Sequence, residues 1–583
     1  MRARLAIALL LALAGCAGPR AIEDRAGAAP VRVKIIAFND FHGALEPPRQ
    51  AVPATAADGA EVRVPAGGAA YLASAIAERR AANPNNVVVS AGDLISASPL
   101  VSAAFLDEPT ILAMNLIGLD INAVGNHEFD RGSAELLRMQ NGGCERHTSR
   151  QPCQVDRDFP GARFRFLAAN VRRENGETLF PAYVIRTFGE GAGEVKVGFI
   201  GLTLEGTAAL VTPAGVAGLT FGDEADTINA LIPRLRAERA DAIVVVIHQG
   251  LSTDVGYNDH SCGGIDGPLL PILARLDPEV DLVVSGHTHN AYVCDYARID
   301  PGRPFLVTSA GRSGTLLTDI DLSIDPAASR VLERRADNLI VQSVAHNDFA
   351  LRDDFPRYAP EPRVASLVGR YVAAVQRVTS RVVGRLQGPA PREASLTGES
   401  VLGNLVADAQ LAATRAPDAG GAQIAFMNVT GVRADLVPAA DGSLTYGQLF
   451  AAQPFANDLV TKSMTGRQIR ALLEQQFDSG SNTVARPGML APSRGLTYRY
   501  DLTRPAGERI IDLRLDGVPL RDEASYRVTM NSFLASGGDN FTVFREGTDP
   551  RVGPSDLEAL ERYIAAASPL APPPADRITR QSP

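Results

Sequence analysis

Residues 31–42 read VRVKIIAFNDFH, an apolar run rich in β-branched residues that ends in a polar cluster. The run is short and bounded by turn-forming residues, so it predicts a buried β-strand over residues 31–38. The cluster directly after it contains Asp40 and His42, whose side chains are common metal ligands. This placement, just past the end of a strand, is the first sign of a functional site.

Four further apolar runs in the first half of the chain end in the same way. They are NVVVSA before Gly92-Asp93, INAV before Gly125-Asn126-His127-Glu128, AIVVVI before His248-Gln249, and VDLVVS before Gly286-His287-Thr288-His289. In an open α/β sheet, the loops beyond the carboxyl ends of the strands share one edge, so residues far apart in sequence converge there. We therefore expect a metal site at this edge of a sheet.

The histidines of the chain are concentrated in these clusters. Five of the eight histidines lie there: His42, His127, His248, His287 and His289. For a single histidine, a hydrogen-bonded structural imidazole is the simpler interpretation, but five at successive strand ends weaken it. Asp, His and Asn donors suit divalent zinc, manganese, cobalt or iron, and such a mixed set does not identify the metal.

Composition favours a large exported enzyme. A chain of 583 residues predicts several domains, at about 150 residues per domain, and 45% hydrophobic residues supply sizeable cores. A net charge of -9 leaves no broad cationic surface, which argues against a polymeric nucleic acid as partner.

The N-terminus resembles an export signal. Arg2 and Arg4 precede the apolar stretch 5–14, which is too short to span a bilayer and fits a signal peptide over residues 1–15. The sequence Leu13-Ala14-Gly15-Cys16 resembles a bacterial lipobox, which implies a lipid on Cys16, a flexible tether over residues 16–30, and a periplasmic or outer-membrane-anchored lipoprotein. Membrane contact is then expected only through the lipid. The alternative is an ordinary cleaved signal peptide with an incidental cysteine.

The remaining four cysteines fit an oxidising compartment, because their number is even. We favour disulfides between Cys144 and Cys153 and between Cys262 and Cys294, since shorter loops cost less chain entropy to close. The other pairings stay open. A metal site built from four thiolates is an alternative, although the CxxC pairs that such sites usually show are missing.

The chain divides into two main parts. Residues 31–345 alternate apolar strand runs with helical stretches near 68–82, 109–116 and 223–239, which is an α/β pattern. Residues 346–381 form a linker in which 364–378 shows helical spacing. A second domain, 382–583, is expected to contain helices at 399–414 and 555–567 and strands near 423–427, 496–500 and 526–530.

The five clusters resemble the signature of the calcineurin-like metallophosphoesterases, D-x-H, GD, GNH, H and GHxH, in this order. The resemblance implies an α/β sandwich of two mixed sheets flanked by helices, joined by a helix to a second, α+β nucleotide-binding domain. It implies two divalent ions, with Asp93 as the bridge, which suits a side chain with two anionic oxygens. The implied ligands are Asp40, His42 and His289 for one ion and Asn126, His248 and His287 for the other.

The same resemblance implies a hydrolytic mechanism. Two cations about 3.5–4 Å apart activate a water molecule and clamp the attacking and leaving oxygens of an in-line phosphoryl displacement. In the family, the residue at His127 contacts the phosphate, and Asp130 would hold its other ring nitrogen. The structural alternative for Asp130 is a helix N-cap.

The second half resembles the bacterial 5'-nucleotidase and UDP-sugar hydrolase family. The matching segments are Glu399–Ala409, Asn428–Arg433, Gln453–Phe455 and Asn531–Phe541. The resemblance implies a nucleobase between Phe455 and Phe533, ribose hydroxyls on Asp539, a phosphate on Arg433 and a nucleoside contact from Asn428. Without it, the Phe residues would be core, Arg433 an ion pair, and Asp539 part of a local turn.

Two features depart from the family pattern. The loop Asn428-Val429-Thr430-Gly431-Val432-Arg433 replaces a Gly-rich NSGGIR or NGGGIR, and Val429 and Thr430 restrict the backbone there. The arginine that usually precedes the Glu399 segment is absent, with Arg392 the nearest candidate. Relatives rotate the second domain about the linking helix, so we expect a hinge near residues 355–366.

The sequence therefore predicts a dinuclear-metal hydrolase that releases phosphate from nucleoside 5'-phosphates, with UDP-sugars as further candidate substrates. The alternatives are a 2',3'-cyclic-nucleotide 2'-phosphodiesterase with 3'-nucleotidase activity, a sulfur-ester hydrolase, and a noncatalytic nucleotide-binding lipoprotein. The paired Phe candidates favour a nucleotide over a small sulfur ester, and an intact His127 and Asp130 argue against a pure binder.

Overall fold

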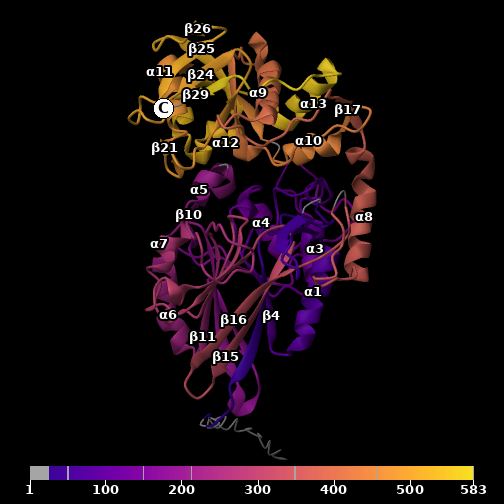
Figure 1. Cartoon of the computed structure of the whole chain (residues 1–583), viewed down its shortest axis with the longest axis vertical. Helices are drawn as coiled ribbons and strands as arrows, with labels where there is room; N and C mark the ends of the chain where they lie inside the picture. The colour runs from indigo at the N-terminus through magenta and orange to yellow at the C-terminus, as the bar shows by residue number, and fades with distance from the viewer. Residues whose placement is uncertain are drawn as a thin grey trace, which may run out of the picture.

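Strand β1 (Val31–Phe38) covers the apolar run that opens the first domain. The computed structural model describes residues 25, 27–48, 51–148, 150–211, 213–346, 349–455 and 457–581. Cys16, the signal peptide and most of the tether lie outside these residues. The described chain forms two lobes, with the second domain stacked on the end of the first and a long helix along one side (Figure 1).

The first domain contains a six-stranded sheet with the order β16-β15-β1-β4-β5-β6. Strands β1, β4, β5 and β6 run parallel, and β15 and β16 add an antiparallel edge. The apolar runs did not predict this edge, because β15 alternates buried with half-buried residues. Its further strands are β4 (Asn86–Ser90), β5 (Ile121–Ala123), β6 (Arg165–Leu167), β15 (Leu316–Asp325) and β16 (Arg330–Ile340).

A second six-stranded sheet, with the order β13-β14-β12-β11-β9-β8, faces the first. Apolar side chains such as Val33, Val89, Phe199 and Val246 fill the space between the sheets. The predicted ligand-bearing strands thus belong to two sheets of one sandwich. The strands are β8 (Tyr183–Phe188), β9 (Val195–Thr203), β11 (Ala242–His248), β12 (Leu282–Ser285), β13 (Ala291–Asp295) and β14 (Leu306–Ala310).

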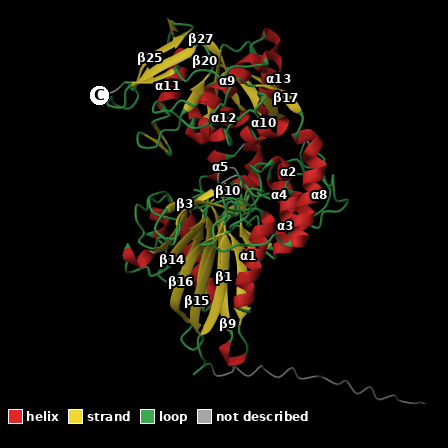
Figure 2. Ribbon diagram, turned by 45° about the vertical axis from the view of Figure 1, so that its right-hand side comes forward, coloured by secondary structure: helices red, strands yellow, loops and turns green. Residues whose placement is uncertain are grey.

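Helices cover the outer faces of the sandwich (Figure 2). The predicted helical stretches become α1 (Ala69–Ala82), α3 (Glu108–Ile117) and α6 (Glu224–Ala237), each shifted by no more than two residues at either end. Asp223 is the N-cap of helix α6, and its side chain accepts a hydrogen bond from Asp226 N. Shorter helices are α2 (Leu100–Ala103), α4 (Ser133–Asn141), α5 (Thr207–Leu210) and α7 (Leu269–Leu273).

The connecting helix α8 (Pro362–Thr379) packs on the first domain. Its Tyr371 is buried, and the Tyr371 and Phe105 ring centroids lie 5.1 Å apart. Asp156 accepts hydrogen bonds from Tyr371 Oη at 2.8 Å and from Arg370 Nη1 at 2.7 Å. Just before the helix, Ser74 Oγ donates to Ala359 O at 2.6 Å. These contacts hold the segment on the first domain in this arrangement, and the hinge expected at residues 355–366 stays a prediction.

The second domain is built on a five-stranded sheet, β23-β18-β27-β20-β28, and a four-stranded sheet, β26-β25-β24-β29. Helix α9 (Val401–Thr414) packs on the larger sheet, and its buried Asp408 forms a two-pronged ion pair with Arg577. The other main elements are β18 (Ile424–Asn428), α10 (Tyr446–Ala452), β20 (Asp458–Thr465), α11 (Gly466–Glu474), β23 (Leu490–Pro492), β24 (Leu496–Tyr500), β25 (Ile510–Leu515), β26 (Val518–Pro519), β27 (Ser525–Asn531), β28 (Thr548–Ser555), α13 (Asp556–Ala567) and β29 (Ile578–Arg580).

The two disulfides join the pairs that the sequence favoured. Cys144 is bonded to Cys153 and Cys262 to Cys294, with Cα–Cα distances of 5.7 Å and 5.0 Å.

Of the helices in the described part of the chain, none combines the length and apolar character that a membrane crossing needs.

Candidate metal centre and substrate pocket

The predicted ligands lie in tight turns at the carboxyl ends of the sandwich strands. Five of them have left-handed backbones, with φ of 49° at Asp40, 46° at His42, 49° at Asp93, 71° at His287 and 60° at His289. Asp and His tolerate this region better than most residues, but it still costs conformational energy. Such strain persists where the surrounding structure fixes the turn, and here it aims side chains from two sheets at one point.

The first group of ligand atoms comes from Asp40, His42 and His289, which lie within 4.8 Å of one another. His289 Nε2 is 3.4 Å from Asp40 Oδ1 and 3.2 Å from His42 Nε2. His42 Nδ1 lies 2.9 Å from Ser96 O, an acceptor, so this nitrogen carries the proton. Nε2 is then left with a lone pair directed at the centre of the group.

The second group consists of Asp93, His248 and His287. His248 Nδ1 donates to Ala91 O at 2.7 Å, and His248 Nε2 lies 3.0 Å from Asp93 Oδ2. The same Asp93 oxygen is 3.6 Å from His42 Nε2 in the first group. Asp93 therefore stands between the two groups, as a bridging ligand must.

The donor set fits two divalent cations. Asn126 Oδ1 is buried and has no hydrogen-bond partner among the described residues, which is the state expected of an amide oxygen reserved for a metal. Burial lowers the pKa of His42 to about 3 and that of His287 to about 4, so both rings are neutral and able to ligate. Burial also lowers the pKa of His248, but the charge of Asp93 outweighs it and raises the value to about 10, so a positive charge is stabilised between these two side chains, where a bound cation would replace the proton.

His127 and Asp130 form the expected pair. His127 Nδ1 donates to Asp130 Oδ2 at 2.8 Å, and the His127 backbone N–H donates to Asp93 Oδ1 at 3.0 Å. Burial lowers the pKa of His127, but the charges of Asp130 and Asp93 more than offset it, so the net shift is upward. Asp130 caps no helix with its side chain, because it follows the short 3-10 turn His127–Phe129 and bonds the imidazole instead.

Two neighbours of the ligands were not predicted to have a role. The buried carboxylate of Glu128 accepts hydrogen bonds from the backbone N–H groups of Asp93 at 3.0 Å, Leu94 at 2.8 Å and Gly125 at 2.8 Å. Asn39 Nδ2 donates to Asp40 Oδ2 at 2.7 Å. Glu128 and Asn39 are each next to, or two residues from, a predicted ligand in the sequence, and this closeness was the only sequence feature that could have indicated their role.

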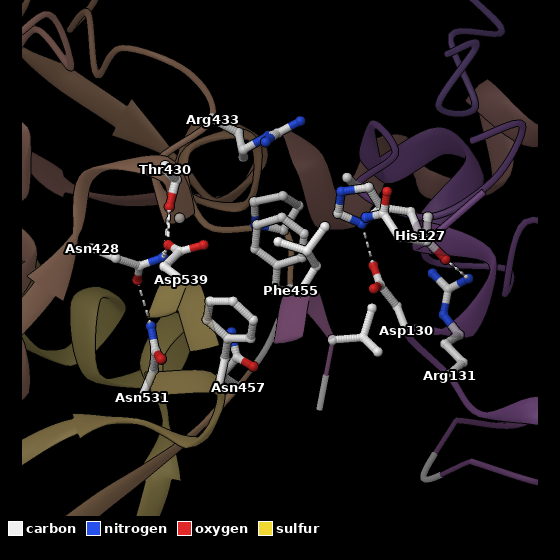
Figure 3. Close-up of a pocket in the computed structure, with 18 of the residues that line it drawn as sticks. His127, Asp130, Arg131, Asn428, Thr430, Arg433, Phe455, Asn457, Asn531 and Asp539 are labelled. Carbon is white, nitrogen blue, oxygen red and sulfur yellow. Dashed lines mark hydrogen bonds and ion pairs between the residues drawn. The ribbon is translucent and has the colours of Figure 1, made fainter. Parts of the chain in front are cut away.

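A cavity of about 270 Å³ lies beside the ligands and is lined by both domains. Figure 3 shows His127, Asp130 and Arg131 on one side of it and the second-domain residues on the other. The second-domain side includes all five predicted substrate residues: Asn428, Arg433, Phe455, Phe533 and Asp539. In this arrangement the metal ligands and the predicted nucleoside pocket already share one space.

Phe455 occupies the middle of this cavity (Figure 3). Its ring lies nearly parallel to that of His127, with an interplanar angle of 14° and centroids 5.8 Å apart, and Arg433 Cζ is 5.8 Å from the Phe455 centroid. The Phe533 ring packs on Gly538, where an added Cβ would come within 2.5 Å of the ring. Neither Phe is buried as a core residue would be.

The positive charge near the pocket comes from arginines. Burial lowers the pKa of Arg433, and the nearby charges of Arg312 and Arg392 lower it further. Arg312 Nη1 lies 3.5 Å from His289 Nδ1, which places it beside the metal centre. Arg392 therefore lies close enough to Arg433 for its charge to lower the pKa of Arg433, although the two residues are far apart in the sequence.

Comparisons with known proteins match this geometry. The calcineurin-like phosphoesterase family matches residues 33–291, and the 5'-nucleotidase C-terminal domain matches residues 382–546. The endonuclease YhcR of Bacillus subtilis is 29% identical over 92% of this chain, although the chain spans only 40% of that protein. The 5'-nucleotidase of Bos taurus is 24% identical, covering 94% of this chain and 91% of its own length.

A solved structure has the same architecture. The 5'-nucleotidase precursor from Thermus thermophilus superimposes with a TM-score of 0.71 at 26% identity. The match covers 94% of this chain and 99% of that structure, so it includes both domains.

Proposed function

The chain belongs to the calcineurin-like phosphoesterases that carry a 5'-nucleotidase C-terminal domain, and on that premise we propose that it releases phosphate from nucleoside 5'-phosphates. It is a metal-dependent phosphoesterase. The observation that carries the substrate proposal is the single cavity in which His127 faces Phe455, Phe533 and Asp539. A phosphate at the metal ligands and a base on an aromatic ring fit together there.

The side chains divide the work. Asp40, His42 and His289 would hold one cation, Asn126, His248 and His287 the other, and Asp93 would bridge them. When bound, two divalent cations polarise the phosphoryl group and lower the pKa of a water molecule. His127, fixed through Nδ1 by Asp130, keeps Nε2 as a donor for the phosphate or the leaving oxygen. Arg433 supplies a planar fork of donors for phosphate oxygens.

The size of the cavity favours mononucleotides over UDP-sugars. Its volume of about 270 Å³ lies just below the range of about 300–1,000 Å³ that ligand pockets usually enclose. A nucleoside monophosphate has one base, one sugar and one phosphate to place between Phe455 and the metal ligands. A UDP-sugar must also place a second phosphate and a second sugar, so we expect slower cleavage.

A substrate panel tests the proposal. Phosphate release from AMP, ATP, UDP-glucose, 3'-AMP and 2',3'-cyclic AMP is measured with Mn²⁺, Zn²⁺, Co²⁺ or Mg²⁺. We expect AMP to be the best of these, and Asp337→Asn, which changes an exposed carboxylate that neither lines the cavity nor belongs to a ligand group, to behave as the wild type. Absence of phosphate release from AMP with every ion, or faster cleavage of the cyclic nucleotide, would contradict the proposal.

We also propose that the protein is exported and anchored by a lipid on Cys16. The two disulfides support this, because disulfides persist in oxidising compartments. A Cys16→Ser variant should move from the membrane fraction to the soluble fraction and lose incorporation of labelled palmitate. An unchanged distribution would rule out the anchor.

A further inference from the structure

The end of the cavity farthest from His127 is closed by a chain of polar side chains (Figure 3). Asn531 Oδ1 accepts a hydrogen bond from the Leu534 backbone N–H at 2.8 Å, which fixes the orientation of its amide. Asn531 Nδ2 consequently donates to Asn428 Oδ1 at 3.0 Å. Because Asn428 Oδ1 accepts this hydrogen bond, the Nδ2 group of the same amide points away from Asn531 and is a donor for other residues.

Asn428 Nδ2 donates to two oxygens, Thr430 Oγ1 at 2.8 Å and Asp539 Oδ2 at 2.7 Å. The Thr430 hydroxyl in turn donates to the same Asp539 oxygen. An ionised carboxylate only accepts, so the direction of this last hydrogen bond is settled. Asp539 Oδ2 therefore already has two donors, both supplied by the loop that departs from the family's Gly-rich pattern.

The other carboxylate oxygen of Asp539 is open. Within the described part of the chain, no donor of the protein is hydrogen-bonded to Asp539 Oδ1, and Asp539 lines the cavity. A vicinal diol, such as that of ribose, binds a carboxylate best when each hydroxyl has its own oxygen. Here Asp539 Oδ2 already accepts two hydrogen bonds from the protein before the substrate binds.

The proposed function puts a nucleotide in this cavity, and the family resemblance puts its sugar at Asp539. On that basis we propose that Thr430 is a specificity-determining residue whose hydroxyl takes the place of one sugar hydroxyl. The pocket then suits phosphate esters that present a single hydroxyl at this point, as 2'-deoxynucleotides do. A ribonucleotide must either displace Thr430 or leave one hydroxyl without its acceptor. With glycine at this position, Asp539 Oδ2 would keep only its Asn428 donor and would have a lone pair free for the second sugar hydroxyl.

The test compares kcat/KM for dAMP and AMP in the wild type and two variants. We expect the wild type to hydrolyse dAMP at least as well as AMP. Thr430→Gly should raise the AMP/dAMP ratio by at least about tenfold, which is near the lower end of the effect of one hydrogen bond to a charged group. Thr430→Ser keeps the hydroxyl and should retain the wild-type ratio within about twofold. Thermal unfolding of both variants checks that they are folded.

The outcomes separate this inference from the proposed function. Hydrolysis of both nucleotides, with a wild-type preference for AMP or with an unchanged ratio in Thr430→Gly, would overturn the role of Thr430 and leave the nucleotidase proposal standing. Failure of the wild type to hydrolyse either nucleotide with any divalent ion would overturn both.

Discussion

The metal centre and the nucleoside end of the pocket are built in opposite ways. At the metal centre, neighbouring groups bond the outer atoms of the ligands, through Ser96 O on His42 and Ala91 O on His248, and leave the inner atoms open. At the nucleoside end, Thr430 and Asn428 bond the inner oxygen of Asp539 itself. On our proposals, the first region accepts any cation of suitable size, whereas the second selects among substrates. Chemistry and specificity would then depend on different domains and could change separately.

Replacement of the bridge should have the largest effect. Asp93→Asn removes the negative charge of a carboxylate that lies near both groups of ligands, so we expect loss of activity well beyond the about 100-fold typical of residues behind a ligand. Metal content measured by mass spectrometry should fall below two ions per chain. Full activity with two bound ions would show that Asp93 does not bridge.

His127→Ala should come next, with kcat lowered about 10²–10⁴-fold, the range for a positioned proton donor. Because His127 is not a ligand, metal content should stay at the wild-type value. Asp130→Asn keeps the shape of the side chain that bonds His127 and should lower kcat less than His127→Ala does. If His127→Ala loses metal in proportion to activity, its role is structural.

Glu128→Gln should weaken the hydrogen bonds that hold the turns around Asp93 and Gly125, without removing a metal ligand. Its carboxylate binds the backbone N–H groups of Asp93, Leu94 and Gly125, so we expect metal affinity to fall about 10–100-fold. Excess metal should then restore activity, which it cannot do for Asp93→Asn. Failure of high metal concentrations to rescue Glu128→Gln would exclude this positioning role.

Phe455→Ala tests the nucleoside end and should have the smallest effect. Loss of one stacking surface should lower kcat/KM for AMP about tenfold, which corresponds to ~1.4 kcal/mol and falls within the usual range for base stacking. The loss for p-nitrophenyl phosphate, which lacks a base, should be smaller. Equal losses for both substrates would mean that Phe455 supports His127 rather than a base.

The sequence predicts the strands behind the two ligand groups more directly than it predicts the contacts at the nucleoside end, and the reason is physical. Short apolar runs such as residues 31–38 predict buried strands, and the polar residues directly after each run are then predicted to lie at the strand ends. Parallel strands in a buried sheet end at one shared edge, so these polar residues are expected to meet. The sequence also foretold α6 and β24 closely, because periodicity is a local property.

Contacts between distant residues could not be foretold in this way. No local pattern shows that Thr430 meets Asp539, that Arg392 acts on Arg433, or that α8 packs on the first domain through Tyr371. The division of the ligand strands between two sheets likewise came from a family resemblance, because strand runs alone do not reveal which strands pair.

The central claim is that two cations share Asp93 between the strand-end turns. Anomalous X-ray scattering from crystals grown with Mn²⁺ tests it most directly. We predict two peaks, one among Asp40, His42 and His289 and one among Asn126, His248 and His287, both in contact with Asp93. A single peak, or none at these side chains, would contradict the account.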